Sequence, residues 1–108
     1  LVYRSKTGAV EEIELKGMPL GGFDDFPYQG KKLSLESGDT VLFMSDGLPE
    51  MFNHQNQLYG EHRVKDLLSV IGSNSPEEIV NALCLAGEEW ADGRAQEDDV
   101  TFVVVKVK

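Results

Sequence analysis

The sequence is poor in cysteine and has no long apolar run. Its single cysteine, Cys84, excludes a disulfide within the chain. Because the neighbours of Cys84 have helical, apolar spacing, we expect it to be a small buried residue in a protein from a reducing compartment. No apolar run approaches the roughly 20 residues needed to cross a bilayer. These absences favour a cytoplasmic segment that makes no membrane contact.

Positive charge is also scarce. The chain has 10 basic and 19 acidic residues, which gives a net charge of -9 and a pI near 4.5. Such a surface repels nucleic-acid phosphates and anionic membranes, so neither is an expected partner. A metal cation or a basic protein surface fits the charge better. An ordinary solvated surface explains the acidity equally well.

The length and composition predict one compact unit over residues 1–108. The chain is 41% hydrophobic and has no internal repeat or long linker. Its first residues, Leu1-Val2-Tyr3-Arg4, contain no initiator Met and already have the composition of a strand. We therefore expect the chain to be part of a longer protein, with a processed N-terminus as the alternative.

Several short apolar segments predict strands. Residues 1–4 and 10–15 flank a turn-forming cluster and predict a hairpin. Residues 32–36 and 40–45 flank Ser37-Gly38-Asp39 and predict a second hairpin. The segment between them, residues 17–30, is rich in glycine and proline and predicts a loop. A last strand is expected over residues 100–107, which are mostly β-branched.

Two helices are expected between the strands. In residues 61–71 the apolar positions follow helical spacing: Val64, Leu67, Leu68 and Ile71. The second helix begins at Ser75-Pro76-Glu77-Glu78, which combines an N-cap hydroxyl, a proline at the first position and a glutamate three residues after the cap. It should end near Gly93. A stripe of Ile79, Leu83, Ala86 and Trp90 predicts its buried face, and we also expect Phe43 and Phe102 in the core. The fold class is α+β with segregated helices.

Acidic residues stand where two of these strands meet loops. Asp46 directly follows the strand at 40–45, and Asp98-Asp99 directly precedes the last strand. If the two strands are antiparallel neighbours, Asp46 and Asp98 come within a few ångströms. Two carboxylates 4 Å apart repel by roughly 4 kcal/mol at an effective dielectric of 20, so the pair would attract a cation. Oxygen ligands favour Mg²⁺ or Mn²⁺.

Other interpretations of these residues remain open. Asp-Gly after a strand is a common turn, and Asp-Asp before a strand also caps loops. His54 and His62 lie in a polar stretch that does not favour them as ligands. A calcium loop over residues 46–61 is disfavoured, because Leu48 and neutral amides occupy positions that need oxygen ligands. Asn53 is expected to cap a turn.

Four blocks in the sequence resemble motifs of SpoIIE-like phosphatases. They are Met18-Pro19-Leu20-Gly21, then Gly38 to Leu48 with Glu50 and Asn53, then Tyr59-Gly60-Glu61 with Arg63, and finally Gln96 with Asp98-Asp99-Val100-Thr101. The blocks occur in the family's order and span nearly the whole chain. Four ordered blocks are more specific than any single one.

The resemblance implies a fold, a cofactor and a reaction. SpoIIE-like proteins are PPM phosphatases, whose two packed β-sheets, flanked by helices, hold a binuclear Mg²⁺ or Mn²⁺ site. By position, Asp46 and Asp98 would be catalytic metal ligands, and Asp99 a further ligand or a residue that supports one. The implied reaction is direct attack of metal-bound water on phosphoserine or phosphothreonine in bacterial signalling. The implied substrate is a phosphorylated regulatory protein, often an anti-sigma-factor antagonist.

The chain also departs from the family pattern. The family's first half carries further metal-site aspartates, and no residues equivalent to that half precede Leu1 in this sequence. We therefore expect a partial, C-terminal portion of the domain, with weak metal binding and little activity by itself. A catalytically inactive regulatory module is the alternative. Open sheet edges and apolar faces would favour pairing with a second copy as a homodimer.

Overall fold

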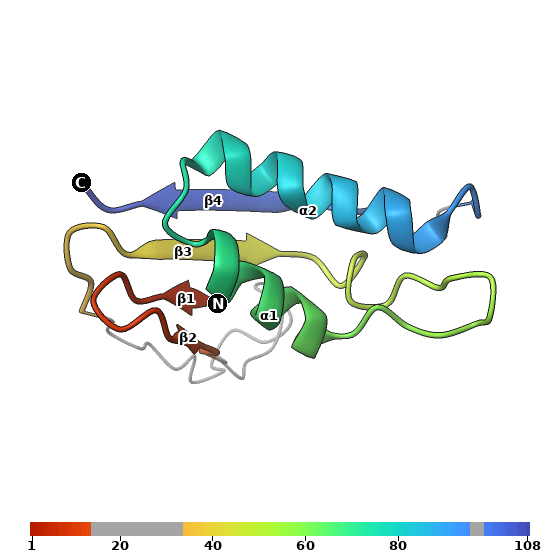
Figure 1. The fold of residues 1–108 in the computed structure, drawn as a ribbon, viewed down its shortest axis with the longest axis horizontal. Coiled ribbons are helices and arrows are strands. Elements are labelled where there is room, and N and C mark those ends of the chain that lie inside the picture. Colours follow the sequence, from red (N-terminus) through yellow and green to blue (C-terminus); the bar gives the residue numbers. More distant parts are fainter. Residues whose placement is uncertain (14–33, 96–98) are drawn as a thin grey trace, which may run out of the picture.

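A four-stranded antiparallel sheet and two helices make up the fold (Figure 1). The computed structural model describes residues 1–13, 34–95 and 99–108. The sheet order is β2-β1-β3-β4. The elements are β1 (Val2–Tyr3), β2 (Val10–Glu11), β3 (Thr40–Met44), α1 (Glu61–Ile71), α2 (Pro76–Ala91) and β4 (Phe102–Lys106). The predicted α+β class is confirmed.

The central pair of strands is β3 and β4. They run antiparallel from the pair Thr40 and Lys106 to the pair Met44 and Phe102. The C-terminal end of β3 therefore lies beside the N-terminal start of β4. This is the antiparallel pairing on which the predicted approach of the two acidic segments depended. On its other edge β3 pairs antiparallel with β1.

The first predicted hairpin is confirmed over a shorter length. β1 and β2 pair antiparallel around a turn in which Gly8 donates to the Arg4 carbonyl over 2.8 Å. Gly8 has a φ of 71°, a backbone conformation that glycine adopts without strain. Residues 14–15 of the predicted strand, and the predicted loop at 17–30, lie outside the described residues.

The second predicted hairpin is wrong in its described part. The turn at Ser37-Gly38 exists, with the Asp39 N–H donating to the Glu36 carbonyl over 3.0 Å. Residues 34–36 before it form no strand. Both edges of β3 are occupied by β1 and β4, so no edge is left for a hairpin partner. The Ser34 carbonyl instead accepts a hydrogen bond from Arg4.

Asp39 fixes the start of β3. Its carboxylate accepts from the Ser5 and Glu36 backbone N–H groups, both at 2.9 Å, and from the Arg4 guanidinium at 3.1 Å. The Asp39 side chain is 2% exposed. The backbone bonds from Glu36 and Ser5, with help from Arg4, lower the pKa of Asp39 to about 2. The carboxylate therefore joins β1, the turn at Ser37-Gly38 and β3.

Both helices follow the sequence prediction closely. α1 has the predicted bounds, and α2 begins after Ser75, whose Oγ accepts from the Glu78 N–H and donates to the Glu78 carboxylate. Ser75 is therefore the predicted N-cap, and the glutamate three residues after it bonds the cap hydroxyl. α2 ends at Ala91, two residues before Gly93. Lys106 of β4 donates to the carbonyls of Ser73 and Asn74 between the helices.

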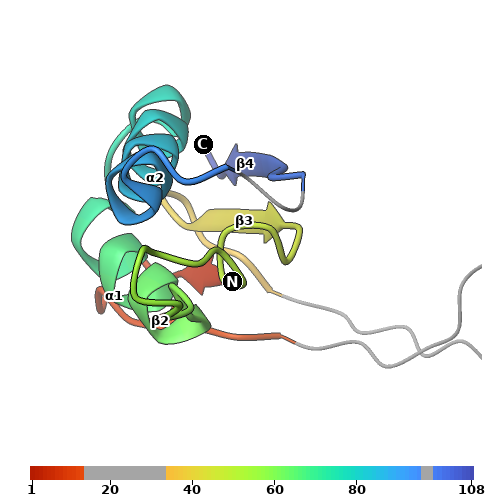
Figure 2. The ribbon, with the colours of Figure 1, turned by 90° about the vertical axis from the view of Figure 1, so that its right-hand side faces the viewer.

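The helices cover one face of the sheet (Figure 2). Leu42 of β3, both helices and the segment between β3 and α1 form the core on that side. Its buried residues are Tyr3, Leu42, Leu48, Tyr59, Val64, Leu68, Ile79 and Leu83. Trp90 and Phe102 pack against it, as expected. Since side chains alternate between the two faces along β3 and β4, Phe43, Val103 and Val105 point away from this core.

Two burial predictions are wrong. Phe43 is 60% exposed, because it lies on the sheet face opposite the helices, next to Val103 and Val105 at 52% and 46%. Cys84 is exposed rather than buried. The buried stripe of α2 is formed by Ile79, Leu83 and Gly87, and Cys84 lies beside that stripe.

Candidate metal site

Asp46 lies at the point where β3 ends and a tight turn begins. Its side chain is exposed, and its carbonyl accepts from the Glu50 N–H over 3.0 Å. Two residues later Leu48 is fully buried in the core under the helices. The turn is therefore anchored by an apolar side chain while Asp46 stays accessible to solvent.

The start of β4 is tied to this turn. The Ser45 N–H donates to the Thr101 carbonyl over 3.1 Å. The Ser45 hydroxyl donates to the Asp99 carbonyl at 3.1 Å and accepts from the Thr101 N–H at 3.0 Å. The two segments that carry the predicted acidic residues are thus joined next to Asp46.

Glycine at position 47 permits this close approach. A Cβ on Gly47 would lie 2.9 Å from the Asp99 carbonyl carbon and from Val100 Cγ2, and nearer still to the Asp99 carbonyl oxygen. Real Cβ atoms do not make backbone contacts this short. Only glycine therefore fits between the turn and the segment before β4. The sequence signal for this role was the Asp-Gly pair.

A second segment supports the turn from the other side. The Gly60 N–H donates to the Pro49 carbonyl over 2.8 Å, and the Tyr59 N–H donates to the Met51 carbonyl over 2.9 Å. Gly60 has a φ of 85° and is the N-cap of α1. The Tyr59-Gly60-Glu61 block therefore joins the Asp46 turn to α1.

The loop between these segments, residues 52–58, is closed by polar contacts. The Asn53 Oδ1 accepts from the N–H groups of Gln55 and Gln57, both at 2.9 Å. This confirms the predicted turn-capping role of Asn53. Arg94 donates to the Asn53 carbonyl over 2.8 Å.

Trp90 of α2 holds the same loop. Its Nε1 donates to the Met51 carbonyl at 2.9 Å and to the Gln57 carbonyl at 3.1 Å. The Arg63 guanidinium lies 4.3 Å from the centre of the Trp90 ring, and the Tyr59 ring meets the indole edge to face at 5.6 Å. The helical spacing of apolar residues in α2 predicted only a packing role for Trp90.

Two carboxylates that the sequence did not indicate line the same cavity as Asp46. A cavity of about 290 Å³ is lined by Asp46 together with Glu12 and Glu61. Glu12 is paired with Lys65 at 2.6 Å, and this bond lowers the pKa of Glu12. Glu61 is the first residue of α1. No sequence signal placed Glu12 there, because its pairing with α1 is a tertiary contact.

The donor chemistry suits a hard cation, but the described residues do not complete a site. Asp46 and Asp99 are exposed carboxylates on opposite sides of the Ser45 contact. Asp98 lies outside the described residues. Within the described residues, no group of three or more His, Cys, Asp or Glu side chains could hold a metal ion. His54 Nε2 hydrogen-bonds the Asp92 carbonyl at 2.7 Å.

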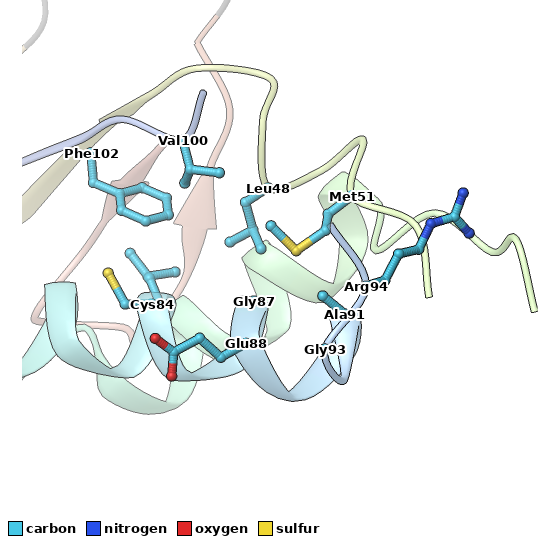
Figure 3. Close-up of a pocket in the computed structure, with 11 residues that line it drawn as sticks. Leu48, Met51, Cys84, Gly87, Glu88, Ala91, Gly93, Arg94, Val100 and Phe102 are labelled. Carbon is cyan, nitrogen blue, oxygen red and sulfur yellow. The ribbon is translucent and has the colours of Figure 1, made fainter. Parts of the chain in front are cut away.

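An apolar groove lies behind the turn, between α2 and β4 (Figure 3). Its volume is about 450 Å³. Leu48 and Met51 enter it from the turn, and Val100 and Phe102 enter it from the other wall. Cys84 also lines the groove, which accounts for its exposure. The Asp46 turn therefore has a packed anchor at Leu48 and an open space beside it.

Comparison with known proteins identifies the family. The family model for stage II sporulation protein E (SpoIIE) matches residues 1–108. The chain belongs to the SpoIIE family. Stage II sporulation protein E of Bacillus subtilis (strain 168) is 29% identical over 100 residues, which is 91% of this chain and 12% of that protein.

Solved structures agree with the SpoIIE assignment at the level of the fold. The SiaA-PP2C domain of Pseudomonas aeruginosa matches with a TM-score of 0.71 and 21% identity, over 75% of this chain and 33% of that one. The phosphatase domain of SpoIIE from B. subtilis, presoaked with Mn, matches with a TM-score of 0.65 and 24% identity, over 98% of this chain and 44% of that one. This SpoIIE-like chain thus has part of the fold of a PPM phosphatase domain, and it spans less than half the length of these structures.

No helix among the described residues of this SpoIIE-family chain is long and apolar enough to cross a membrane.

Proposed function

We propose that this chain forms part of a metal-dependent protein phosphatase domain that hydrolyses phosphoserine or phosphothreonine with Mg²⁺ or Mn²⁺. In this proposal Asp46 and Asp98 are metal ligands and Asp99 is a further ligand or supports one. The substrate is a phosphorylated regulatory protein in the bacterial cytoplasm, of the anti-sigma-factor antagonist type. Family membership and the placement of Asp46 support the proposal.

The observation that carries this proposal is the junction of the β3 end and the β4 start. Asp46 is exposed on a turn whose next residues, Gly47 and Leu48, are buried. A carboxylate mounted on a buried turn loses little conformational freedom when it binds a ligand. Ser45 holds the segment that contains Asp99 against this turn. Asp46 and Asp99, which are far apart in the sequence, therefore lie at the same end of the β3–β4 strand pair.

The residues of this chain bind and orient rather than attack. Asp46 supplies an oxygen ligand, and the Gly47 contact sets how closely the two segments approach. The chemistry that Mg²⁺ or Mn²⁺ supplies when bound is neutralisation of phosphate oxygens and a lower pKa for an attacking water. Since the described residues do not complete a metal site, further ligands come from the rest of the domain in this proposal.

The exposed sheet face supports the same proposal. Phe43, Val103 and Val105 are between 46% and 60% exposed on adjacent strands. An apolar sheet face of this kind is normally covered by another layer. We expect the remainder of the phosphatase domain to cover it, or a second copy when the chain is alone.

The test compares the chain with the complete domain that contains it. We expect the complete domain to hydrolyse a phosphoserine peptide only with Mn²⁺ or Mg²⁺, and residues 1–108 alone to show little turnover. Asp46→Asn should abolish the metal-dependent rate, whereas Glu89→Gln, on the exposed side of α2, should leave it intact. Metal-independent turnover, or full activity in Asp46→Asn, would refute the proposal.

A further inference from the structure

Ser45 makes contacts that the turn itself does not need. The regular β3–β4 pairing ends at Met44 and Phe102, and the Ser45 N–H extends it by one bond to the Thr101 carbonyl. Beyond that point the contacts between the two segments are made by the Ser45 side chain. The Ser45 hydroxyl donates its one proton to the Asp99 carbonyl and accepts from the Thr101 N–H.

These bonds need a group that both donates and accepts, as a hydroxyl does. A serine Oγ has one proton and two lone pairs, so it can bridge a carbonyl and an amide N–H of the segment before β4. The Gly47 N–H also points at this oxygen, at a longer distance of 3.5 Å. One atom thus touches the backbone on both sides of Val100 and the backbone just after Asp46. Alanine at position 45 would remove the three contacts of the hydroxyl and would keep the backbone bond from the residue 45 N–H.

We infer that the Ser45 hydroxyl is a positioning residue, a clamp that holds the Asp46 turn against the segment of Asp99 and Thr101. It touches no reacting group. Its role is to set the separation between the Asp46 carboxylate at the β3 end and the segment of Asp99 that precedes β4. The consequence for metal binding rests on the proposed function, because it assumes that these carboxylates are ligands.

The clamp works together with Gly47. The glycine lets the two segments approach, and the hydroxyl keeps them there, since Ser45 and Gly47 contact the same Asp99 carbonyl region. Residues that orient metal ligands typically change metal affinity by 10- to 100-fold when they are mutated. We therefore expect about a tenfold or greater loss of Mn²⁺ affinity in Ser45→Ala. Ser45→Thr keeps the hydroxyl and should restore the affinity.

The experiment uses the complete phosphatase domain and three measurements. Mn²⁺ binding is measured by isothermal titration calorimetry, folding by thermal unfolding, and the clamp itself by hydrogen exchange of the Thr101 amide. Ser69→Ala is the matched control, because Ser69 also bonds a backbone carbonyl, that of Asp66, but on the exposed side of α1. It should change neither Mn²⁺ affinity nor Thr101 exchange.

The outcomes separate this inference from the proposed function. Faster Thr101 exchange and weaker Mn²⁺ binding in Ser45→Ala, with Ser45→Thr close to wild type, support the clamp and its role. Unchanged Thr101 exchange overturns the inference, and so does unchanged Mn²⁺ affinity in a wild-type domain that binds the ion. If the wild-type domain binds no Mn²⁺ at all, the proposed function fails, and Thr101 exchange alone decides whether the clamp exists.

Discussion

Replacing Gly47 with alanine tests how closely the two acidic segments must approach. The added methyl would lie 2.9 Å from the Asp99 carbonyl carbon and Val100 Cγ2, where ordinary contacts begin at 3.4 Å. The obstructing atoms are largely backbone, so they cannot turn aside as a flexible side chain would. The segment before β4 must move away by roughly 0.5 to 1 Å, and overpacking of this kind typically costs about 1–3 kcal/mol.

The same movement predicts a larger effect on function than on folding. A misplacement of about 1 Å in a positioned group can lower a rate by roughly 100-fold. For a complete domain of about 150–250 residues, each kcal/mol lowers Tm by about 2–4 °C. We therefore expect Gly47→Ala to remain folded in the complete domain at 25 °C while its metal-dependent turnover falls by about two orders of magnitude.

Gly93→Ala is the control for this experiment. A Cβ on Gly93 would meet nothing within 4 Å, but its φ of 86° makes alanine strained, at a cost of about 1 kcal/mol. Both variants thus lose stability, and only Gly47→Ala crowds the Asp46 turn. The assay is Mn²⁺-dependent hydrolysis with thermal unfolding of the same samples. If Gly47→Ala loses no more turnover than Gly93→Ala, the close-approach argument is wrong.

Three further predictions concern stability and association. Leu48→Ala should lower the free energy of unfolding by about 2–5 kcal/mol in urea titrations, whereas Leu85→Ala, at a site 53% exposed, should change it by less than about 0.5 kcal/mol. Because the folded-state pKa of Asp39 is depressed from 3.8 to about 2, its stabilisation is present above pH 4 and lost as the pH falls toward 2. The urea midpoints of wild type and Asp39→Asn should accordingly differ at pH 7 and converge near pH 2. Residues 1–108 should self-associate in analytical ultracentrifugation through the exposed sheet face, and Phe43→Lys with Val103→Lys should disperse them; a wild-type chain that sediments as a monomer at high concentration would contradict this.

Local signals in the sequence predicted the helices well. α1 has the predicted bounds because Val64 and Leu68 mark its buried face. α2 begins after Ser75 because the cap and the proline act within one turn. The exposed strand end at Asp46 was also predictable, since an apolar run followed by Asp-Gly marks where a strand stops. These features depend on interactions between residues close in sequence.

Features that depend on distant partners could not be predicted in the same way. The apolar run in β3 gave no sign of which side chains would face the helices, so Phe43 was wrongly placed in the core. Residues 34–36 were assigned to a strand because nothing in the sequence indicates that β1 and β4 occupy both edges of β3. The Ser45 contacts to Asp99 and Thr101 likewise require the β3–β4 register to be known.

The position of Trp90 gives the Asp46 region an intrinsic optical reporter. It is the only tryptophan in the chain, and its indole N–H bonds the backbone of the segment that follows the turn. If that segment separates from α2, the indole N–H loses both carbonyl acceptors, and its environment becomes more aqueous. The emission of the unlabelled chain should then shift to longer wavelength, so movements of this loop can be followed by fluorescence without adding a dye.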